Sequence, residues 1–184
     1  MADEQRRSAE SERELVALAQ GGNERAFAEL ISPYQSLMYG VCYRITGSEH
    51  DALDAVQDAM LAAWRFLGRF EHRSRFSTWL YRIAHNAALA CAQKRIPEPV
   101  DLDLAPAPAT GSGPDALVAD NDALQWALAR IPPEFRATLV LREYAGFSTE
   151  EIAEIQGVEV TTVRTRTARA RKALAALLAE AGAV

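Results

Sequence analysis

The segment from Ser148 to Lys172 constrains the fold more than any other part of the sequence. It reads STEEIAEIQGVEVTTVRTRTARARK. Ser148 and Glu151 have the spacing of a capping box, so a helix is expected to begin there. Gly157 allows a left-handed turn before a second helix. Apolar residues for the buried faces of the two helices follow at Ile152, Ile155, Val158 and Val163. The segment therefore predicts two short helices joined by a turn.

The second of these helices has a one-sided charge. Between Val160 and Ala179 the sequence has no acidic residue and five basic ones: Arg164, Arg166, Arg169, Arg171 and Lys172. A helix-turn-helix whose second helix carries such charge can enter a major groove and neutralise phosphates. An ordinary helical hairpin with a solvated basic face is the alternative, because such hairpins are common.

Apolar residues spaced three and four apart continue through the first half of the chain and indicate further helices. After a disordered start we expect a short helix over 11–20. A longer one should follow, capped by Asn23, kinked near Pro33 and ended by Gly47. Ser48 and Asp51 form a second candidate capping box, opening a helix to Leu67, and a fourth helix is expected over 77–93. Inward-facing residues are predicted at Leu53, Val56, Met60, Ala63, Trp64 and Leu67 in the third helix, and at Leu80, Ile83, Ala84, Ala87 and Cys91 in the fourth. Nothing reads as a strand.

The composition changes abruptly at Pro97. From there to Ala119 the sequence has five prolines, two glycines, four acids and no sustained period, as in a linker. Helices are expected again from about Asp120, with a break at Pro132-Pro133. We therefore predict an all-α fold of two small helical domains joined by a flexible linker. The expected boundaries are a tail or short helix over 1–22, a first domain over 23–96, the linker over 97–119 and a second domain over 120–184.

Several functional classes are excluded by what the sequence lacks. No apolar run is long enough to span a membrane, and the polar start has no secretory leader, so a cytoplasmic location is expected. The three histidines and two cysteines lack metal-ligand spacing, and there is no glycine-rich phosphate loop. We therefore expect no metal, no cofactor and no enzymatic activity. Cys42 and Cys91 are expected to be small core residues and not a disulfide.

Aromatic and basic residues are interleaved between Phe66 and Arg95, although the net charge of the chain is −5. The aromatic residues are Phe66, Phe70, Phe76, Trp79 and Tyr81, and the basic ones are Arg69, Arg73, Arg75, Arg82, Lys94 and Arg95. Aromatic faces stack on bases, at ~1–3 kcal/mol per base, while cations follow the phosphates of a single strand. The alternative is a set of core aromatics with a solvated basic rim.

Three stretches resemble the extracytoplasmic-function (group IV) sigma factors of bacterial RNA polymerase. They are DALDAVQDAMLAAW, RFSTWLYRIAHNAAL and LARIPPEFRATLVLREYAGFSTEEIAEIQGVEVTTVRTRTARARKAL, in the order found in that family. The resemblance covers about residues 23–178 without the linker. It implies an initiation factor in which sigma region 2 and region 4 recognise the −10 and −35 promoter elements. Its implied partners are core RNA polymerase, through the β′ clamp helices and the β flap, promoter DNA and an anti-sigma factor, with no insertion into a membrane.

The resemblance also assigns site residues by matching positions. Contacts with the β′ clamp helices are expected from Asp54, Gln57, Asp58 and Trp64. Melting and reading of the −10 element are expected from Arg73, Arg75, Phe76, Ser77, Thr78, Trp79, Arg82 and Asn86. Reading of the −35 duplex is expected from Thr162, Arg164, Thr165, Arg166, Arg169 and Lys172. Thr161 and Thr167 depart from the usual pattern, which has glycine and an aliphatic residue there, and Thr161 is expected to cap its helix.

Two other functions stay open at this point. A stand-alone helix-turn-helix regulator would use only the second domain and would bind a palindromic site as a dimer. An interaction protein that merely sequesters polymerase would not need the arginines of the recognition helix. For a sigma factor with flexibly tethered domains, we expect weak promoter binding by the free chain, which polymerase strengthens by fixing the spacing of the two domains.

Overall fold

A computed structural model describes the backbone of residues 2–94 and 116–181, and the side chains of 10–94 and 121–181. The first module contains α1 (Ala2–Gln20), α2 (Glu24–Ile31), η1 (Ser32–Tyr34), α3 (Gln35–Thr46), α4 (Glu49–Phe66), η2 (Leu67–Arg69) and α5 (Phe76–Gln93). The second contains α6 (Ala116–Arg130), α7 (Pro133–Leu139), the π-helical turn η3 (Val140–Tyr144), α8 (Thr149–Gln156) and α9 (Val160–Glu180). No strand occurs in these ranges, so the predicted all-α class is confirmed. Residues 95–115, which include most of the linker predicted over 97–119, lie outside the described part.

The predicted helix boundaries rest on side-chain caps that are present in the structure. The Asn23 side chain accepts a hydrogen bond from the backbone N–H of Ala26 at 3.0 Å. Gly47 ends α3 with a φ of 71°, a left-handed conformation that glycine adopts without strain. Ser148 and Glu151 make both bonds of the capping box that opens α8. These caps fix where α2, α3 and α8 begin or end.

Three predicted boundaries are wrong. Helix α1 begins at Ala2 and not near residue 11, because residues 2–10 contain helix-favouring Ala, Glu, Gln and Arg and no glycine or proline. Helix α6 begins at Ala116, inside the predicted linker, since Pro114 is the last helix breaker before it. The N-cap of α9 is Glu159 and not Thr161, because the Glu159 carbonyl already accepts the backbone N–H groups of Thr162 and Val163 at 2.9 and 3.2 Å.

Helix α4 packs through a stripe of alanines, which corrects the predicted core. The four fully buried residues of this stripe are Ala52, Ala55, Ala59 and Ala63. Leu53 was expected to face inward, but it is 54% exposed. Small side chains allow α3 and α5 to approach α4 closely, so the larger residues lie beside the contact or outside it. Of the other predicted inward residues, Val56, Met60 and Trp64 are half-buried.

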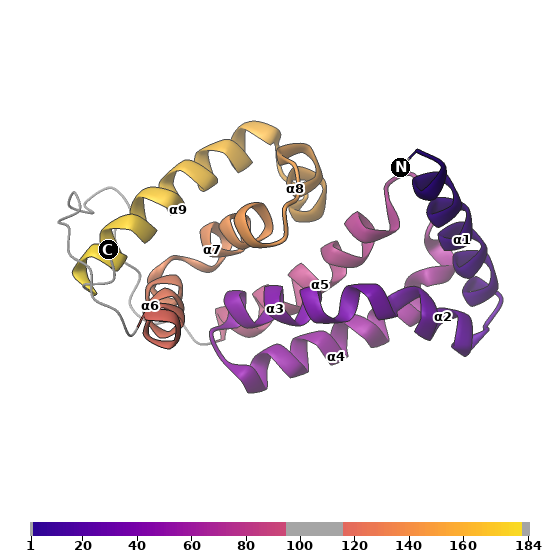
Figure 1. The fold of residues 1–184 in the computed structure, drawn as a ribbon, viewed down its shortest axis with the longest axis horizontal. Helices are drawn as coiled ribbons and strands as arrows, with labels where there is room; N and C mark the ends of the chain where they lie inside the picture. The colour runs from indigo at the N-terminus through magenta and orange to yellow at the C-terminus, as the bar shows by residue number, and fades with distance from the viewer. Residues whose placement is uncertain (1, 95–115, 182–184) are drawn as a thin grey trace.

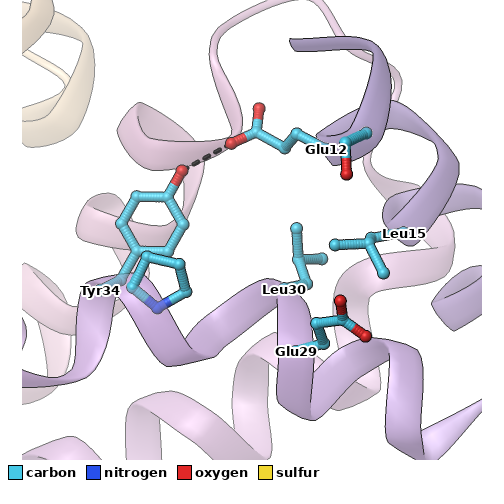
Figure 2. Close-up of a pocket in the computed structure, with 7 residues that line it drawn as sticks. Glu12, Leu15, Glu29, Leu30 and Tyr34 are labelled. Carbon is cyan, nitrogen blue, oxygen red and sulfur yellow. Dashed lines mark hydrogen bonds between the residues drawn. The ribbon is translucent and has the colours of Figure 1, made fainter. Parts of the chain in front are cut away.

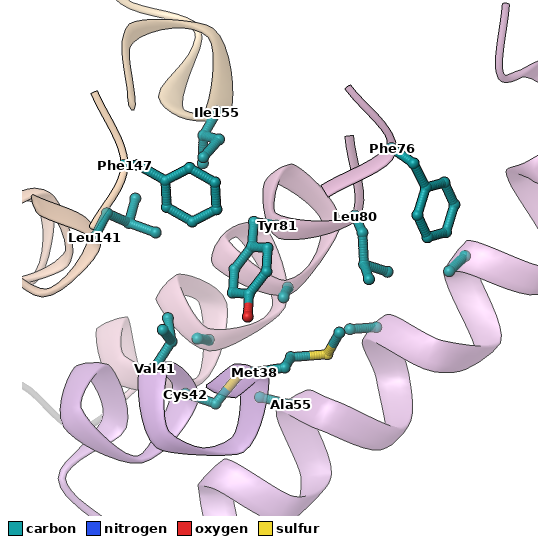
Figure 3. Packing of buried hydrophobic residues seen from close by; sticks show 14 of the residues in the cluster. Met38, Val41, Cys42, Ala55, Phe76, Leu80, Tyr81, Leu141, Phe147 and Ile155 are labelled. Carbon is teal, nitrogen blue, oxygen red and sulfur yellow. The ribbon is translucent and has the colours of Figure 1, made fainter. Parts of the chain in front are cut away.

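The two modules pack against each other (Figure 1). Helix α5 contacts α7 and α8, while α3 contacts α6, α7 and η3. One continuous apolar cluster includes residues of both modules. Figure 3 shows Tyr81 of α5 between Phe147 of the second module and Met38 and Cys42 of α3. The Tyr81 and Phe147 rings meet edge to face, with centroids 4.9 Å apart. This contact between the modules was not predicted from the sequence.

A buried arginine joins the two modules at another point. Arg136 of α7 is 4% exposed and donates hydrogen bonds to three backbone carbonyls. Its Nη1 lies 2.6 Å from the carbonyl oxygen of Ile45 in the last turn of α3. Its other nitrogens reach the carbonyls of Ala129 and Ile131 at 2.7–3.2 Å. Burial lowers the pKa of this guanidinium to about 10, which leaves it charged at neutral pH. Arg136 therefore links α7 to the carboxyl ends of α3 and α6.

Substitution of Arg136 should destabilise the whole fold. Arg136→Met removes the donors and leaves buried carbonyls without partners, at ~1–3 kcal/mol for each group that finds no replacement. We expect the free energy of unfolding in urea to fall by at least about 2 kcal/mol. Arg142→Met is the matched control, because Arg142 is exposed and makes one bond, to the Phe147 carbonyl. An equal loss of stability in the two variants would contradict the role given to Arg136.

His85 forms a second polar link between the modules. This residue of α5 is 4% exposed; its Nδ1 lies 3.2 Å from Asn86 Oδ1 and its Nε2 lies 3.3 Å from Gln156 Nε2 at the end of α8. Arg166 Nη1, which can only donate, lies 3.4 Å from the Gln156 side-chain oxygen, so the amide nitrogen of Gln156 faces His85 and donates to it. The imidazole is then neutral, with its proton on Nδ1. Burial lowers the pKa of His85 and outweighs the hydrogen bond with Asn86, which raises it; Arg166 of α9 lowers the pKa further, and Glu134 of α7 raises it.

This link should make stability depend on pH. Because the pKa of His85 is lower in the folded chain than its ordinary value of ~6.5, the unfolded chain binds more protons below that pH. Stability should therefore be fully present above pH 6.5 and should fall below it, by up to about 1 kcal/mol at pH 5.5. Urea unfolding of the wild type and of His85→Gln across this range measures the difference. Identical pH profiles would show that His85 does not titrate in this way.

Candidate nucleic-acid interface

The loop before α5 holds a cluster of aromatic rings. Phe70, Phe76 and Trp79 have ring centroids 5.2–5.7 Å apart. The Gln20 side chain at the end of α1 fixes the loop by donating to the carbonyls of Leu67 and Phe70 at 3.0 and 2.9 Å. Phe70 and Phe76 are buried, whereas Trp79 is half-buried and keeps part of its ring accessible. Phe70 and Phe76 therefore fit the alternative of core aromatics, whereas Trp79, which borders the surface, keeps a ring face that could stack on a base.

A cavity of about 440 Å³ lies against these rings. Phe70 and Trp79 form its apolar wall, and the cationic groups around it belong to Arg69, Arg73 and Arg82. Arg73 also pairs with Glu71 of the same loop at 2.6 Å, with both side chains largely exposed. Glu154 of the second module also lines the cavity. The cavity combines a flat apolar face with nearby positive charge, as a base and its phosphate require.

The residues predicted to read the −10 element are brought together around this cavity and along α5, but they differ in exposure. Arg73, Arg75, Arg82 and Asn86 are exposed, Ser77 and Trp79 are half-buried, and Phe76 and Thr78 are buried. Phe76 and Thr78 are 2% and 1% exposed, so neither offers a surface to a ligand in this conformation. These two side chains support the loop from inside.

Two of the exposed arginines are already engaged by α8. Arg82 donates to the backbone carbonyl of Glu154 from Nε at 3.0 Å and from Nη2 at 2.7 Å. Arg75 Nη1 lies 3.3 Å from Oε1 of Glu151. The other oxygen of Glu151 accepts the N–H of Ser148 in the capping box. Sequence reasoning did not identify Glu154 or Glu151 as neighbours of this site, because nothing local in the sequence pairs α8 with α5.

Helix α9 presents its predicted −35 residues on the face opposite to its buried stripe. The predicted residues Arg164, Thr165, Arg169 and Lys172 are exposed, and the buried positions are Val163, Thr167, Ala170, Ala173, Ala176 and Leu177. Thr162 and Arg166 are half-buried at the edge, where Arg166 lies 3.4 Å from the Gln156 side chain. Arg171, which was not predicted as a reader, pairs with Glu143 of η3. Figure 1 shows α9 on the side of the second module away from α3 and α5.

The predicted polymerase-binding residues lie along the exposed face of α4. Asp54, Gln57 and Asp58 are exposed, while Trp64 is half-buried and packs edge-on against Phe27, with ring centroids 5.0 Å apart. The same face carries Leu53 and Leu61, which are 54% and 48% exposed. Leu53 was missed because its spacing also fits a core stripe, and Leu61 was assigned neither to the core nor to an interface. The alanine stripe is the signal that could have revealed them, since it occupies the position where the core residues lie.

The other features of the described residues add no reactive group. A pocket of about 240 Å³ lies between α1 and the α2–η1 segment; Glu12, Leu15, Glu29, Leu30 and Tyr34 line it, and Tyr34 donates a hydrogen bond to Glu12 (Figure 2). Cys42 and Cys91 are free thiols, and burial raises the pKa of Cys42 to about 12. Within the described ranges no group of three or more possible metal ligands occurs. None of the helices there has the length and apolarity needed to span a membrane.

Comparison with known proteins identifies both modules. The sigma-70 region 2 family matches residues 30–95, and the sigma-70 region 4 family matches residues 121–174. The chain is 36% identical to the RNA polymerase sigma-H factor of Pseudomonas aeruginosa, over 94% of this chain and 98% of that protein. It is 38% identical to the ECF RNA polymerase sigma-E factor of Escherichia coli K12, over 87% and 90% of the two chains.

A solved structure has the same fold. CnrH, in complex with the cytosolic domain of CnrY, superposes with a TM-score of 0.71 and 28% identity, over 91% of this chain and 97% of that one. The matches cover both modules in the order expected from the three sequence motifs. The chain therefore belongs to the extracytoplasmic-function group of the sigma-70 family and is an RNA polymerase sigma factor.

Proposed function

We propose that this sigma factor reads promoter DNA with two surfaces on different modules and binds core polymerase through a third. The observation that carries the proposal is the cavity beside α5, where the Phe70 and Trp79 rings lie among arginines. Aromatic faces that stack on bases, next to guanidinium groups that follow phosphates, suit an unpaired DNA strand. The −10 element is the part of a promoter that must be melted.

Each residue around the −10 surface takes the role that its exposure allows. Trp79 stacks on a base, while Arg73, Arg75 and Arg82 hold phosphates. Ser77 and Asn86 offer hydrogen bonds to the strand. Phe76 and Thr78 are buried and position the loop without touching DNA. A base that leaves the duplex for the cavity costs a few kcal/mol to unstack, which these contacts must offset.

The −35 element is read as duplex by the outward face of α9. One arginine, Arg164 or Arg169, placed against a guanine edge would discriminate by ~1–3 kcal/mol. Thr162, Thr165, Arg166 and Lys172 complete the contacts, mainly with phosphates. Thr167 is 9% exposed and belongs to the packing of the helix, so its departure from the aliphatic residue usual in this family bears on stability more than on base contacts.

The α4 face binds core polymerase. Its acids, Asp54 and Asp58, favour a basic partner surface such as the β′ clamp helices, and the exposed leucines beside them supply apolar contact area. Gln57 and Trp64 complete this face, and the second module is proposed to bind the β flap. Such a surface differs from a solvated acidic face because it exposes Leu53 and Leu61 in the middle of the charged residues.

Regulation by an anti-sigma factor is part of the proposal. The RpoE protein of Bartonella quintana was solved in complex with the anti-sigma factor NepR, and it shares the fold of this chain with a TM-score of 0.62 and 25% identity. We infer that a comparable partner binds this chain. The chain acts without a cofactor and without catalysis of its own, in the cytoplasm where polymerase works.

The decisive test is transcription reconstituted with core polymerase on a library of promoters from the same organism. Start-site-specific transcripts should depend on this chain, and their absence on every promoter would reject the proposal. Trp79→Ala should abolish promoter opening, measured by permanganate reactivity, because stacking contributes ~1–3 kcal/mol per base. Trp126→Ala, which removes an exposed tryptophan of α6, is the control and should open promoters normally. Normal opening by the Trp79 variant would exclude its melting role.

Polymerase binding through α4 has a separate test. Leu53→Gln should weaken the affinity for core polymerase by about 1 kcal/mol or more, because an apolar contact is lost at the interface. Leu18→Gln on α1 is the matched control, since the two leucines are equally exposed, at 54%. Thermal unfolding should be nearly unchanged in both variants, as expected for surface positions. Equal polymerase affinities would remove α4 from the interface.

A further inference from the structure

A further pocket lies between α7 and the first two turns of α9. It has a volume of about 270 Å³, and the residues that line it are Phe135 of α7 and Thr161, Thr162, Thr165 and Arg166 of α9. The two helices pack against each other (Figure 1). Each of the described residues that line this pocket belongs to the second module. The pocket therefore needs no side chain of the first module.

The pocket is continuous with the face of α9 that carries the proposed −35 contacts. Thr162, Thr165 and Arg166 are already among those contacts. Thr161 and Thr165 are both exposed and lie one turn apart on the same side of the helix. In helix-turn-helix proteins the N-terminal residues of the recognition helix meet the base edges in the major groove. The pocket thus lies where base edges are expected.

The lining of the pocket is largely apolar, although the helix beside it is strongly basic. Phe135 supplies a half-buried aromatic ring, and each of the three threonines has a methyl group. The Thr165 hydroxyl donates to the carbonyl of Thr161 at 3.0 Å, so its proton is used within the helix. Thr165 can then offer a ligand its methyl group and an acceptor, but no donor.

One DNA base in particular suits such a lining. Thymine carries a methyl group at its major-groove edge, whereas cytosine, guanine and adenine present hydrogen-bonding atoms there and no methyl group. Threonine methyl groups and phenylalanine rings are characteristic partners of the thymine methyl group. An apolar hollow on a recognition helix therefore favours thymine and gives no advantage to cytosine.

Arg166 places a cation at the rim of the pocket. Its guanidinium carbon lies 6.0 Å from the centre of the Phe135 ring, and its Nη1 lies 3.4 Å from the side-chain oxygen of Gln156. That oxygen also accepts from the buried hydroxyl of Thr138 at 2.9 Å. Contacts of arginine with phosphates fix the register of a protein on the duplex. Arg166 can therefore hold the DNA backbone beside the base that the pocket receives.

We propose that this pocket reads the methyl group of one thymine in the −35 element, and that Thr161 is the residue that determines this specificity. The choice of duplex DNA as the ligand rests on the proposed function, whereas the pocket itself does not. Glycine, which is usual at position 161 in this family, has no methyl group to contribute. Thr161 thus gives the chain a preference for thymine at one −35 position.

The experiment first identifies the −35 sequence that the chain prefers. The full-length chain with core polymerase selects duplexes from a random library, and sequencing gives the preferred base at each position. Duplexes of that sequence are then made with deoxyuridine in place of each −35 thymine in turn, which removes one methyl group. Affinities for these duplexes are measured at one ionic strength. Substitution of one thymine should lower the affinity about fourfold, as expected for one buried methyl group.

Two variants of Thr161 then test its role at that position. Thr161→Ser removes the methyl group and keeps the hydroxyl, whereas Thr161→Val removes the hydroxyl and keeps a methyl group. In Thr161→Ser the loss of affinity on uracil substitution should shrink to less than about twofold, but in Thr161→Val it should stay near fourfold. A role in helix stability alone would weaken both duplexes equally and leave this ratio unchanged. Circular dichroism verifies that both variants are folded.

The other outcomes count against the proposal. If a −35 sequence is enriched but none of its thymines responds to uracil, the pocket does not read a methyl group. An equal response in Thr161→Ser and the wild type, or a lost response in Thr161→Val, would remove Thr161 as the determinant. If the selection enriches no −35 sequence, the proposed −35 reading fails and the role of the pocket fails with it. That result is distinct, because it appears before any uracil is introduced.

Discussion

The arrangement of the modules depends on the charge of Arg136, which is buried and has no carboxylate partner among the described residues. Backbone dipoles stabilise this buried charge, because the carbonyls that accept its hydrogen bonds include those of Ile45 and Ala129, in the last turns of α3 and α6. Helix ends leave such carbonyls unsatisfied and carry partial negative charge. One guanidinium therefore completes helix ends from both modules. A separated second module would have to give up the Ile45 bond and return that side of the guanidinium to water, so the closed packing and the satisfaction of this group are coupled.

Much of the fold could be predicted because its helix ends are fixed by local chemistry. The capping bonds at Asn23 and Ser148 and the left-handed glycines at 47 and 157 each act within a few residues, so the sequence displays them directly. Burial is different, because it depends on which elements meet. Leu53 fits a helical stripe as well as Ala52 does, and only the close packing of α4 on α3 and α5 decides between them. The contact of α8 with α5 is likewise set by residues about 70 positions apart.

The candidate site also has features that the local sequence predicts and features that depend on tertiary contacts. Residue types and spacing were enough to select the arginines and Trp79, since stacking and phosphate binding need those groups whatever the packing around them. Phe76 belongs to the same pattern and Thr78 was added by the family resemblance, but the structure buries both side chains. It also missed Glu151 and Glu154, whose importance comes from what lies opposite them. Local patterns thus identify the chemistry of a site, while its present partners depend on tertiary contacts.

The balance between exposed and buried contacts determines what holds α8 over α5. The Arg75 side chain is 80% exposed, and pairs of this kind contribute only ~0–1 kcal/mol in water. Such contacts orient α8 over α5 but are too weak to hold it there. The stability of the closed form must therefore come from Tyr81 on Phe147 and from Arg136, which a DNA strand does not touch. Salt screens these exposed pairs, so their contribution falls further as the ionic strength rises. The buried contacts between the modules are screened much less, and they keep α8 in place over α5.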